Sequence, residues 1–169
     1  MPLSVETVNS RLFTLATDYS KELLSCLGDE LVSVVLFGSV ARGEASASSD
    51  VDLFIVIRDL PKGRFVRKER LRAADQKIAP ALEALWEEGI DTSFCRILKT
   101  PEEAERIVPI YLDLVEDAVF LVDKGDFLRT VLSNLRRRLQ EIGARRLTLG
   151  KIRYWDLKPD FKPLERFTI

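Results

Sequence analysis

The sequence contains no histidine, and this absence removes a large part of enzyme chemistry. Ser-His-Asp hydrolysis, Cys-His nucleophiles and histidine-ligated zinc or iron are excluded, because each needs an imidazole. Cys26 and Cys95 are the only cysteines, too few for a thiolate zinc site or a disulfide scaffold. Chemistry in this chain must therefore rest on carboxylates, hydroxyls, lysine, arginine and metals that prefer oxygen ligands.

The sequence also lacks an excess of one charge and any long apolar run. Its 26 basic and 27 acidic residues nearly cancel, so no overall field attracts nucleic acid or a membrane surface. No apolar run approaches the ~20 residues that cross a bilayer, and the N-terminus does not resemble a signal peptide. We therefore expect a reduced, cytoplasmic protein without a membrane partner.

The apolar residues that are present, 46% of 169, suffice for one compact domain. Apolar positions at three- and four-residue steps predict amphipathic helices, and nearly continuous apolar, β-branched runs predict buried strands. The helices are expected at residues 5–27, 71–88, 101–116 and 127–142, and the strands at 31–37, 51–57, 91–98 and 118–122. Pro80 and Pro109 predict breaks or kinks in the second and third helices.

We divide the chain near residue 124, where the alternating helices and strands give way to one helix and a tail. Residues 1–123 form the main domain, and residues 124–169 form a helix and a tail that pack on the domain or on a partner. The tail mixes aromatic and basic residues with two prolines and is not expected to fold independently.

Two aspartates stand one residue apart where the second strand begins. Because side chains alternate along a strand, Asp50 and Asp52 point to one face while Val51 and Leu53 point to the other. Two neighbouring carboxylates repel each other unless a cation lies between them. Magnesium resolves that repulsion, and it fills its remaining positions with water and phosphate oxygens, so the pair indicates nucleoside triphosphate chemistry.

The loop between the first two strands has the composition of a phosphate-binding loop. Gly38 permits a close backbone approach, the Ser39 hydroxyl can contact phosphate oxygens, and Arg42 can add a charge-assisted contact. Arg42 and its neighbour Glu44 could equally be solvated loop charges. Ser49 can either cap the strand entry or touch phosphate. An ordinary loop with solvated acids is the alternative to the whole interpretation.

The string GSVARGEASASSDVDL, from Gly38 to Leu53, resembles the signature of the nucleotidyltransferase superfamily that includes DNA polymerase beta. It is most similar to the minimal nucleotidyltransferase branch of prokaryotes. The resemblance implies an α/β (α+β) nucleotidyltransferase fold: a short mixed sheet with helices mainly on one face, here followed by a helical C-terminal extension and tail. It covers about residues 10–98.

The resemblance also implies an activity and a set of site residues. A nucleoside monophosphate, AMP from ATP in our interpretation, would pass to a hydroxyl acceptor with loss of pyrophosphate. Gly38 and Ser39 would bind the triphosphate. Two magnesium ions would be held by Asp50, Asp52 and a third carboxylate on a neighbouring strand, for which Asp91 is the candidate; the alternative for Asp91 is a cap at the start of its strand.

Two other functions remain open at this stage. Small members of this branch are often paired with HEPN-domain proteins in toxin-antitoxin systems, so the chain could modify such a partner or act as an antitoxin-like binding module. Basic residues from 136 to 153 could instead contact RNA together with Tyr154 and Trp155, or could be a solvated helix face. Trp155 and Phe161 could also cover an apolar groove or bind a partner.

Overall fold

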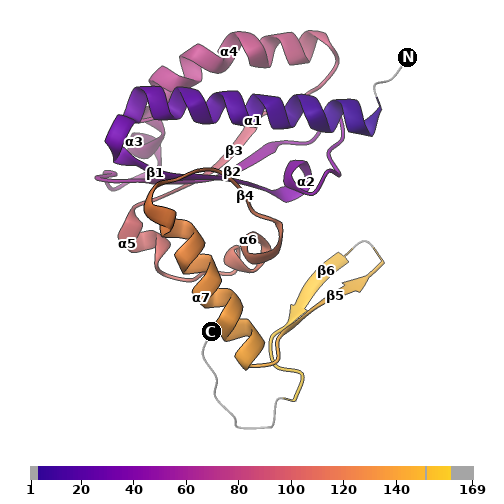
Figure 1. Cartoon of the computed structure of the whole chain (residues 1–169). Helices are drawn as coiled ribbons and strands as arrows, with labels where there is room; N and C mark the ends of the chain where they lie inside the picture. The colour runs from indigo at the N-terminus through magenta and orange to yellow at the C-terminus, as the bar shows by residue number, and fades with distance from the viewer. Residues whose placement is uncertain (1–3, 151, 161–169) are drawn as a thin grey trace.

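A four-stranded mixed β-sheet lies at the centre of the protein, which we describe from a computed structural model covering residues 4–150 and 152–160. The strand order is β3-β2-β1-β4 (Figure 1). Strand β1 runs antiparallel to β2 and β4, whereas β2 and β3 are parallel. The strands are β1 (Leu31–Phe37), β2 (Val51–Ile57), β3 (Phe94–Lys99) and β4 (Val119–Asp123). The expected short mixed sheet is confirmed.

Two long helices, α1 (Val5–Leu27) and α4 (Arg72–Glu87), cover one face of the sheet. The Ser4 hydroxyl accepts a hydrogen bond from the Thr7 amide at 3.1 Å and so caps the start of α1, as the sequence predicts. A kink or a break was expected at Pro80, and the structure shows no break, because α4 continues through this residue. The broad apolar face of α4, packed against α1, stabilises the helix despite the missing amide hydrogen bond.

The segment after residue 100 covers the opposite face with α5 (Pro101–Ala104), α6 (Tyr111–Asp117) and α7 (Phe127–Glu141). The expectation that helices lie mainly on one face of the sheet therefore holds only for the part of the chain up to α4. The carboxylate of Asp123 accepts from the Leu128 and Arg129 amides at 3.0 Å each and caps α7. Leucines of α7 share a core with β1 and α6, so α7 packs on the main domain. The division at residue 123 stays a prediction.

Two short helices, two turns of 3₁₀-helix and a β-hairpin are absent from the sequence-based interpretation. The short helices are α2 (Gly38–Ala41) and α3 (Arg64–Glu69), and the 3₁₀ turns are η1 (Gly28–Glu30) and η2 (Lys124–Asp126). The hairpin consists of β5 (Arg145–Leu149) and β6 (Ile152–Asp156). The expectation for Phe161 lies outside the described residues.

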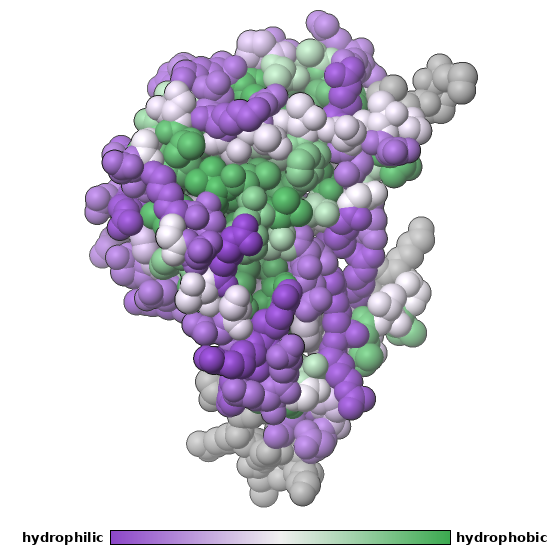
Figure 2. All heavy atoms as spheres, in the orientation of Figure 1, coloured by the Kyte–Doolittle hydropathy of each residue, from purple (hydrophilic) through white to green (hydrophobic). Residues whose placement is uncertain are grey.

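The face of the protein seen in Figure 2 carries both charged and apolar side chains. Figure 2 shows apolar side chains gathered between α1 and α7, on the side where β4 forms the edge of the sheet. Within the described ranges, no helix combines the length and the hydropathy that a membrane span requires.

Candidate active site

Asp50 and Asp52 lie at the start of β2, where the sheet is open to the loop that follows β1. Asp52 is opposite Phe37 on β1 and Cys95 on β3. Val51 and Leu53 belong to the core under α1 and α4, so the side chain of Asp52 points to the other face of the sheet. The alternation expected from the sequence is therefore present.

Gly38 brings the chain against the Asp52 carboxylate. Its φ of +75° is one that residues with a side chain rarely adopt. A Cβ placed at Gly38 would overlap the Oδ2 atom of Asp52. Glycine is therefore required here for two separate reasons, its backbone conformation and the space that the carboxylate occupies.

Neither aspartate is neutralised by a basic side chain. Among the described residues no salt bridge includes Asp50 or Asp52. Asp50 Oδ1 instead accepts from the Ser93 hydroxyl at 2.8 Å and from the Ser93 amide at 3.2 Å. Burial raises the pKa of Asp52 and the negative charge of Asp50 raises it further, whereas a hydrogen bond with Cys95 and the positive charge of Arg42 lower it.

The neighbouring strand supplies no third carboxylate beside this pair. Asp91 is exposed and precedes β3 by three residues, whereas Cys95 is the residue opposite Asp52. No group of three or more acidic, cysteine or histidine side chains within residues 4–150 and 152–160 is arranged to hold a metal ion. The structure therefore does not bring Asp91 into a site with Asp50 and Asp52. The sequence suggested Asp91 only because it is the sole acid in that segment.

Cys95 was not among the residues predicted for the site. Burial raises the pKa of its thiol, the carboxylates of Asp52 and Asp50 raise it further, and the positive charge of Arg64 lowers it. The thiol is therefore held protonated as a hydrogen-bond donor to Asp52. Only the pairing of β2 with β3 reveals this contact, so the sequence alone carried no signal for it.

In the loop from Gly38 to Asp50, the hydroxyl of Ser39 is left without a hydrogen-bond partner among the described residues, whereas the hydroxyl of Ser49 is used within the loop. Ser39 lies in α2, and its hydroxyl has no hydrogen-bond partner among the described residues, so it is available to a ligand. The Ser49 hydroxyl accepts from the Ser46 amide at 2.9 Å and closes the turn before β2. Of the two roles left open for Ser49, the structure shows the local one.

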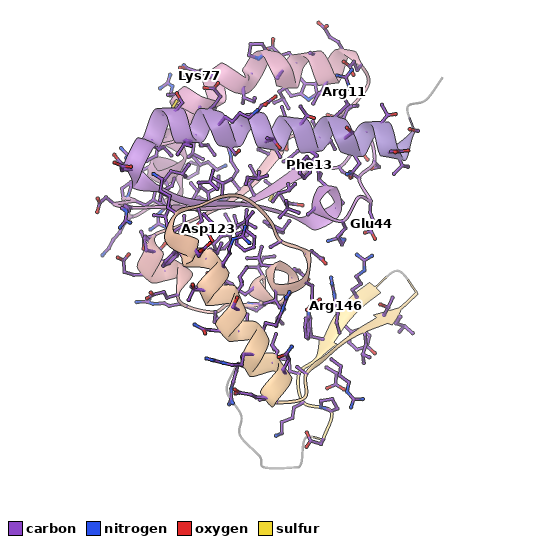
Figure 3. All side chains as sticks on the ribbon, viewed as in Figure 1. Arg11, Phe13, Glu44, Lys77, Asp123 and Arg146 are labelled. Carbon is purple, nitrogen blue, oxygen red and sulfur yellow. The ribbon has the colours of Figure 1, made fainter. Side chains whose placement is uncertain are left out.

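Arg42 belongs to a network of charges at the other side of the same loop. Its Nε lies 2.9 Å from Oε2 of Glu44, and its Nη1 lies 3.2 Å from Oδ2 of Asp117 at the end of α6. The hairpin completes the network, because Arg146 donates two hydrogen bonds to Asp117 at 2.8 and 2.9 Å and Arg153 pairs with Glu44. Figure 3 shows Glu44 beside α2 and Arg146 on the hairpin below it.

These arginines lower the pKa values of Glu44 and Asp117, whereas the pKa of Asp52 is raised. Arg146, assisted by Arg42, holds the pKa of Asp117 below its usual range. Hydrogen bonds from Arg153 and Arg42 lower the pKa of Glu44 to about 2. Both acids are therefore neutralised from within the protein, and neither requires a metal ion.

The arrangement fits one divalent ion held by Asp50 and Asp52. Two carboxylates on one face, with no basic partner and with a pKa raised in Asp52, form a site that favours a cation. Hard divalent ions complete their coordination with water and phosphate oxygens, and the open side of this site faces the loop with Ser39 and Arg42. The chemistry that the arrangement supports is the binding and activation of a phosphate chain.

Comparison with known proteins agrees with this interpretation. The family described as Nucleotidyltransferase domain matches residues 19–136. A Methanocaldococcus jannaschii protein named "Putative protein adenylyltransferase MJ1305" is 30% identical over 115 residues, which are 68% of this chain and 74% of that protein. A second protein of that organism, named "Putative protein adenylyltransferase MJ0141", is 36% identical over 50 residues, 30% of this chain and 50% of that protein.

Solved structures similar to this chain have low sequence identity. A toxin-antitoxin crystal structure with AMP-PNP has a TM-score of 0.46 at 20% identity and covers 75% of this chain and 92% of that chain. The structure of a nucleotidyltransferase from Sulfolobus solfataricus has a TM-score of 0.41 at 20% identity and covers 71% of this chain and 87% of that chain.

Proposed function

Because the chain belongs to the nucleotidyltransferase domain family, we propose that this transferase moves AMP from ATP to a hydroxyl group of a protein. The observation that carries the proposal is the pair Asp50 and Asp52, placed without a basic partner against the loop at Gly38. The choice of AMP and of a protein acceptor follows the names of the two curated relatives. The metal in this proposal is magnesium, and Asp50 and Asp52 are its protein ligands.

The residues of the site have separate tasks in this reaction. Asp50 and Asp52 hold the divalent ion, which when bound neutralises charge on the phosphates. Ser39 and the backbone at Gly38 position the β- and γ-phosphates. Arg42, which the sequence suggested for the same task, is held by Glu44 and Asp117 and is left out of the phosphate contacts. The acceptor oxygen forms a bond to the α-phosphorus as the bond to pyrophosphate breaks. The hydroxyl proton passes to a carboxylate of the pair or to water.

Positioning and charge neutralisation carry this catalysis, in keeping with phosphoryl transfer in general. Ser93 supports the site by donating two hydrogen bonds to Asp50, which fixes the orientation of that carboxylate. Cys95 has the same effect on Asp52. Asp91 is left out of the metal site, and the proposal needs one ion rather than two.

The test uses ATP labelled at either the α- or the γ-phosphate. Wild-type protein with magnesium should transfer the α-label, not the γ-label, to an acceptor protein and release pyrophosphate. The Asp50→Asn, Asp52→Asn double variant should transfer neither label. Transfer of the γ-label, or equal transfer by the double variant, would contradict the proposal.

A second candidate function is an antitoxin-like binding module. The observation that favours it is the missing third acid, because β3 places Cys95 rather than a carboxylate beside Asp52. A HEPN-domain protein is the partner that the resemblance of the loop motif suggests. If neutralisation of that partner survives the Asp50→Asn, Asp52→Asn double change, binding rather than transfer is the function.

RNA binding through the basic C-terminal segment is less well supported. Arg146 and Arg153 are paired with Asp117 and Glu44, and Arg136 donates to the Val115 carbonyl. Cations that are engaged within the fold are poorly available to phosphates.

A further inference from the structure

A groove of about 530 Å³ lies along β3, and six of its ten lining residues are cations. One wall is β3 itself, and the other is α3 with the turn before it. The basic residues that line the groove are Lys62, Arg64, Arg67, Lys68, Arg96 and Lys99, and Glu103 is the one acid among them. We call this feature the β3-edge groove. Its charge stands out in a chain whose total charge is close to zero.

Four of these cations form no salt bridge among the described residues, although the charge of Lys99 also acts on the carboxylate of Glu103. Arg67 makes two hydrogen bonds to Glu103, at 2.7 and 2.8 Å, and Arg96 pairs with Asp75, so these two are neutralised. In the described part of the chain, no salt bridge includes the other four, which are Lys62, Arg64, Lys68 and Lys99. Like charges gathered without counter-ions repel one another, and an anionic partner removes that repulsion.

The groove begins beside the candidate metal site. Cys95 is opposite Asp52, and Arg96, the next residue of β3, already lines the groove. Lys99 lies four residues beyond Cys95, which corresponds to about 13 Å along a strand. A chain of about four extended residues could therefore occupy the groove and still place its next residue at Asp52.

The form of the groove suits a polypeptide rather than RNA. Strand β3 pairs with β2 alone among the described strands, so its outer side is a sheet edge of the kind that binds extended peptides. The Leu98 carbonyl of β3 already accepts a hydrogen bond from Arg67, so a peptide would pair with the rest of the edge. No aromatic residue lines the groove, although single-stranded RNA is usually held by stacking on aromatic side chains.

We propose that the β3-edge groove binds an acidic, extended segment of the acceptor protein and presents the hydroxyl of that segment to the site at Asp50 and Asp52. This inference rests on the proposed function for the transfer step only. Binding of the acidic segment is a separate property, because the groove and its cations do not depend on the metal.

The first experiment measures binding without ATP. A fluorescein-labelled hexapeptide with one tyrosine flanked by glutamates is titrated with wild-type protein, and an otherwise identical peptide with glutamines is the reference. The glutamate peptide should bind at least about 10-fold more tightly, and added salt should reduce the difference. The Lys62→Gln, Lys68→Gln, Lys99→Gln triple variant should lose this preference.

A matched triple variant controls for total charge. Arg11→Gln, Lys21→Gln, Lys77→Gln removes three exposed cations from α1 and α4, none of which lines the groove, and should leave the peptide preference unchanged. Equal binding by the groove variant and the wild type would overturn the proposal. If oligouridylate displaces the labelled peptide at a lower concentration than the unlabelled glutamate peptide does, the proposal is overturned in favour of RNA.

The second experiment measures transfer of the α-label from ATP to the same peptides. The glutamate peptide should have a kcat/KM about 10-fold higher than the glutamine peptide in the wild type, and the ratio should fall toward one in the groove variant. Groove-dependent binding with no such ratio would refute presentation of the hydroxyl. Groove-dependent binding with no transfer to any acceptor, and no release of pyrophosphate, would refute the proposed function and leave the docking site standing.

Discussion

Two pairs of carboxylates flank the same loop, and the protein treats them in opposite ways. Asp50 and Asp52 begin β2 without a salt bridge in the described residues, and burial raises the pKa of Asp52. Glu44 and Asp117, on the other side of the loop, are paired with arginines that lower the pKa values of both carboxyl groups. The first pair has an unmet need for positive charge, whereas the second pair is satisfied.

This difference separates a binding site from a structural contact. The fold brings three arginines to Glu44 and Asp117, two of them from the distant hairpin, so acids in this region can be neutralised where structure requires it. Asp50 and Asp52 are left to a cation from solution. A pair of acids whose repulsion persists in the folded protein is stabilising only when its ligand is bound.

Removal of one unpaired carboxylate should have the largest effect on activity. Asp52→Asn should reduce AMP transfer on the order of 1,000-fold, because the ion loses one of its two protein ligands. The melting temperature should not fall, since the change removes a buried charge that Asp50 repels. Steady-state transfer assays and thermal unfolding measure the two effects.

Asp91→Asn is the comparison for this variant. Asp91 precedes β3 and does not join the pair, so transfer should stay within about threefold of the wild type. A loss as large as that of Asp52→Asn would mean that Asp91 reaches the metal during the reaction.

Two glycines of the loop allow the effect of steric overlap to be measured separately from the effect of backbone strain. Gly38 and Gly43 have φ values of +75° and +74°, but only a Cβ at Gly38 would meet another group, the Asp52 carboxylate. Gly38→Ala should reduce transfer about 100-fold by displacing that carboxylate. Gly43→Ala should lower stability by about 1 kcal/mol with little change in transfer. Equal losses of transfer would show that backbone strain alone explains the effect.

A change in the satisfied pair should affect stability rather than chemistry. The Asp117 side chain is 9% exposed and accepts two hydrogen bonds from Arg146. Asp117→Asn should lower the free energy of unfolding by about 2 kcal/mol, because it weakens charge-assisted hydrogen bonds and leaves Arg146 without its counter-ion. Urea unfolding measures the loss.

The exposed pair of Arg138 and Glu141 provides the control for Asp117. Glu141→Gln removes a carboxylate that is 53% exposed and should change the free energy of unfolding by less than about 0.5 kcal/mol. If both variants lose the same stability, the network around Asp117 is an ordinary surface contact.

The smallest expected effect is the contribution of Glu44 to the dependence of stability on pH. The pKa of Glu44 is about 2 in the folded protein and 4.5 in the reference state. Its contribution is thus fully present above pH 4.5 and is lost as the pH falls toward 2. The difference in stability between the wild type and Glu44→Gln should shrink across this window. A difference that stays constant from pH 6 to 2.5 would contradict the pairing with Arg153.

The fold was predictable where local pattern and packing agree. The apolar runs at residues 31–37 and 51–57 are β1 and β2 at the same bounds, and helix α1 begins after the Ser4 cap as expected. The hairpin was not predicted, although residues 146–149 alternate polar and apolar residues before Gly150. Such a short alternation in a charged segment is a weak signal.

The candidate site was predictable to the extent that it depends on spacing. Gly38, Ser39, Asp50 and Asp52 stand out because a loop and a strand start fix their relation to one another. Cys95, Asp117 and the hairpin arginines reach the loop only through tertiary contacts between distant segments, which spacing does not encode. Asp91 illustrates the limit, since the register of β3 decides which residue lies beside Asp52.

Binding of a non-hydrolysable ATP analogue, with and without magnesium, tests the central claim most directly. Isothermal titration should detect binding to the wild type that requires magnesium, and the Asp50→Asn, Asp52→Asn double variant should lose it while remaining folded. Binding that is equal without the metal, or equal in the double variant, would contradict the assignment of the unpaired aspartates as the metal site.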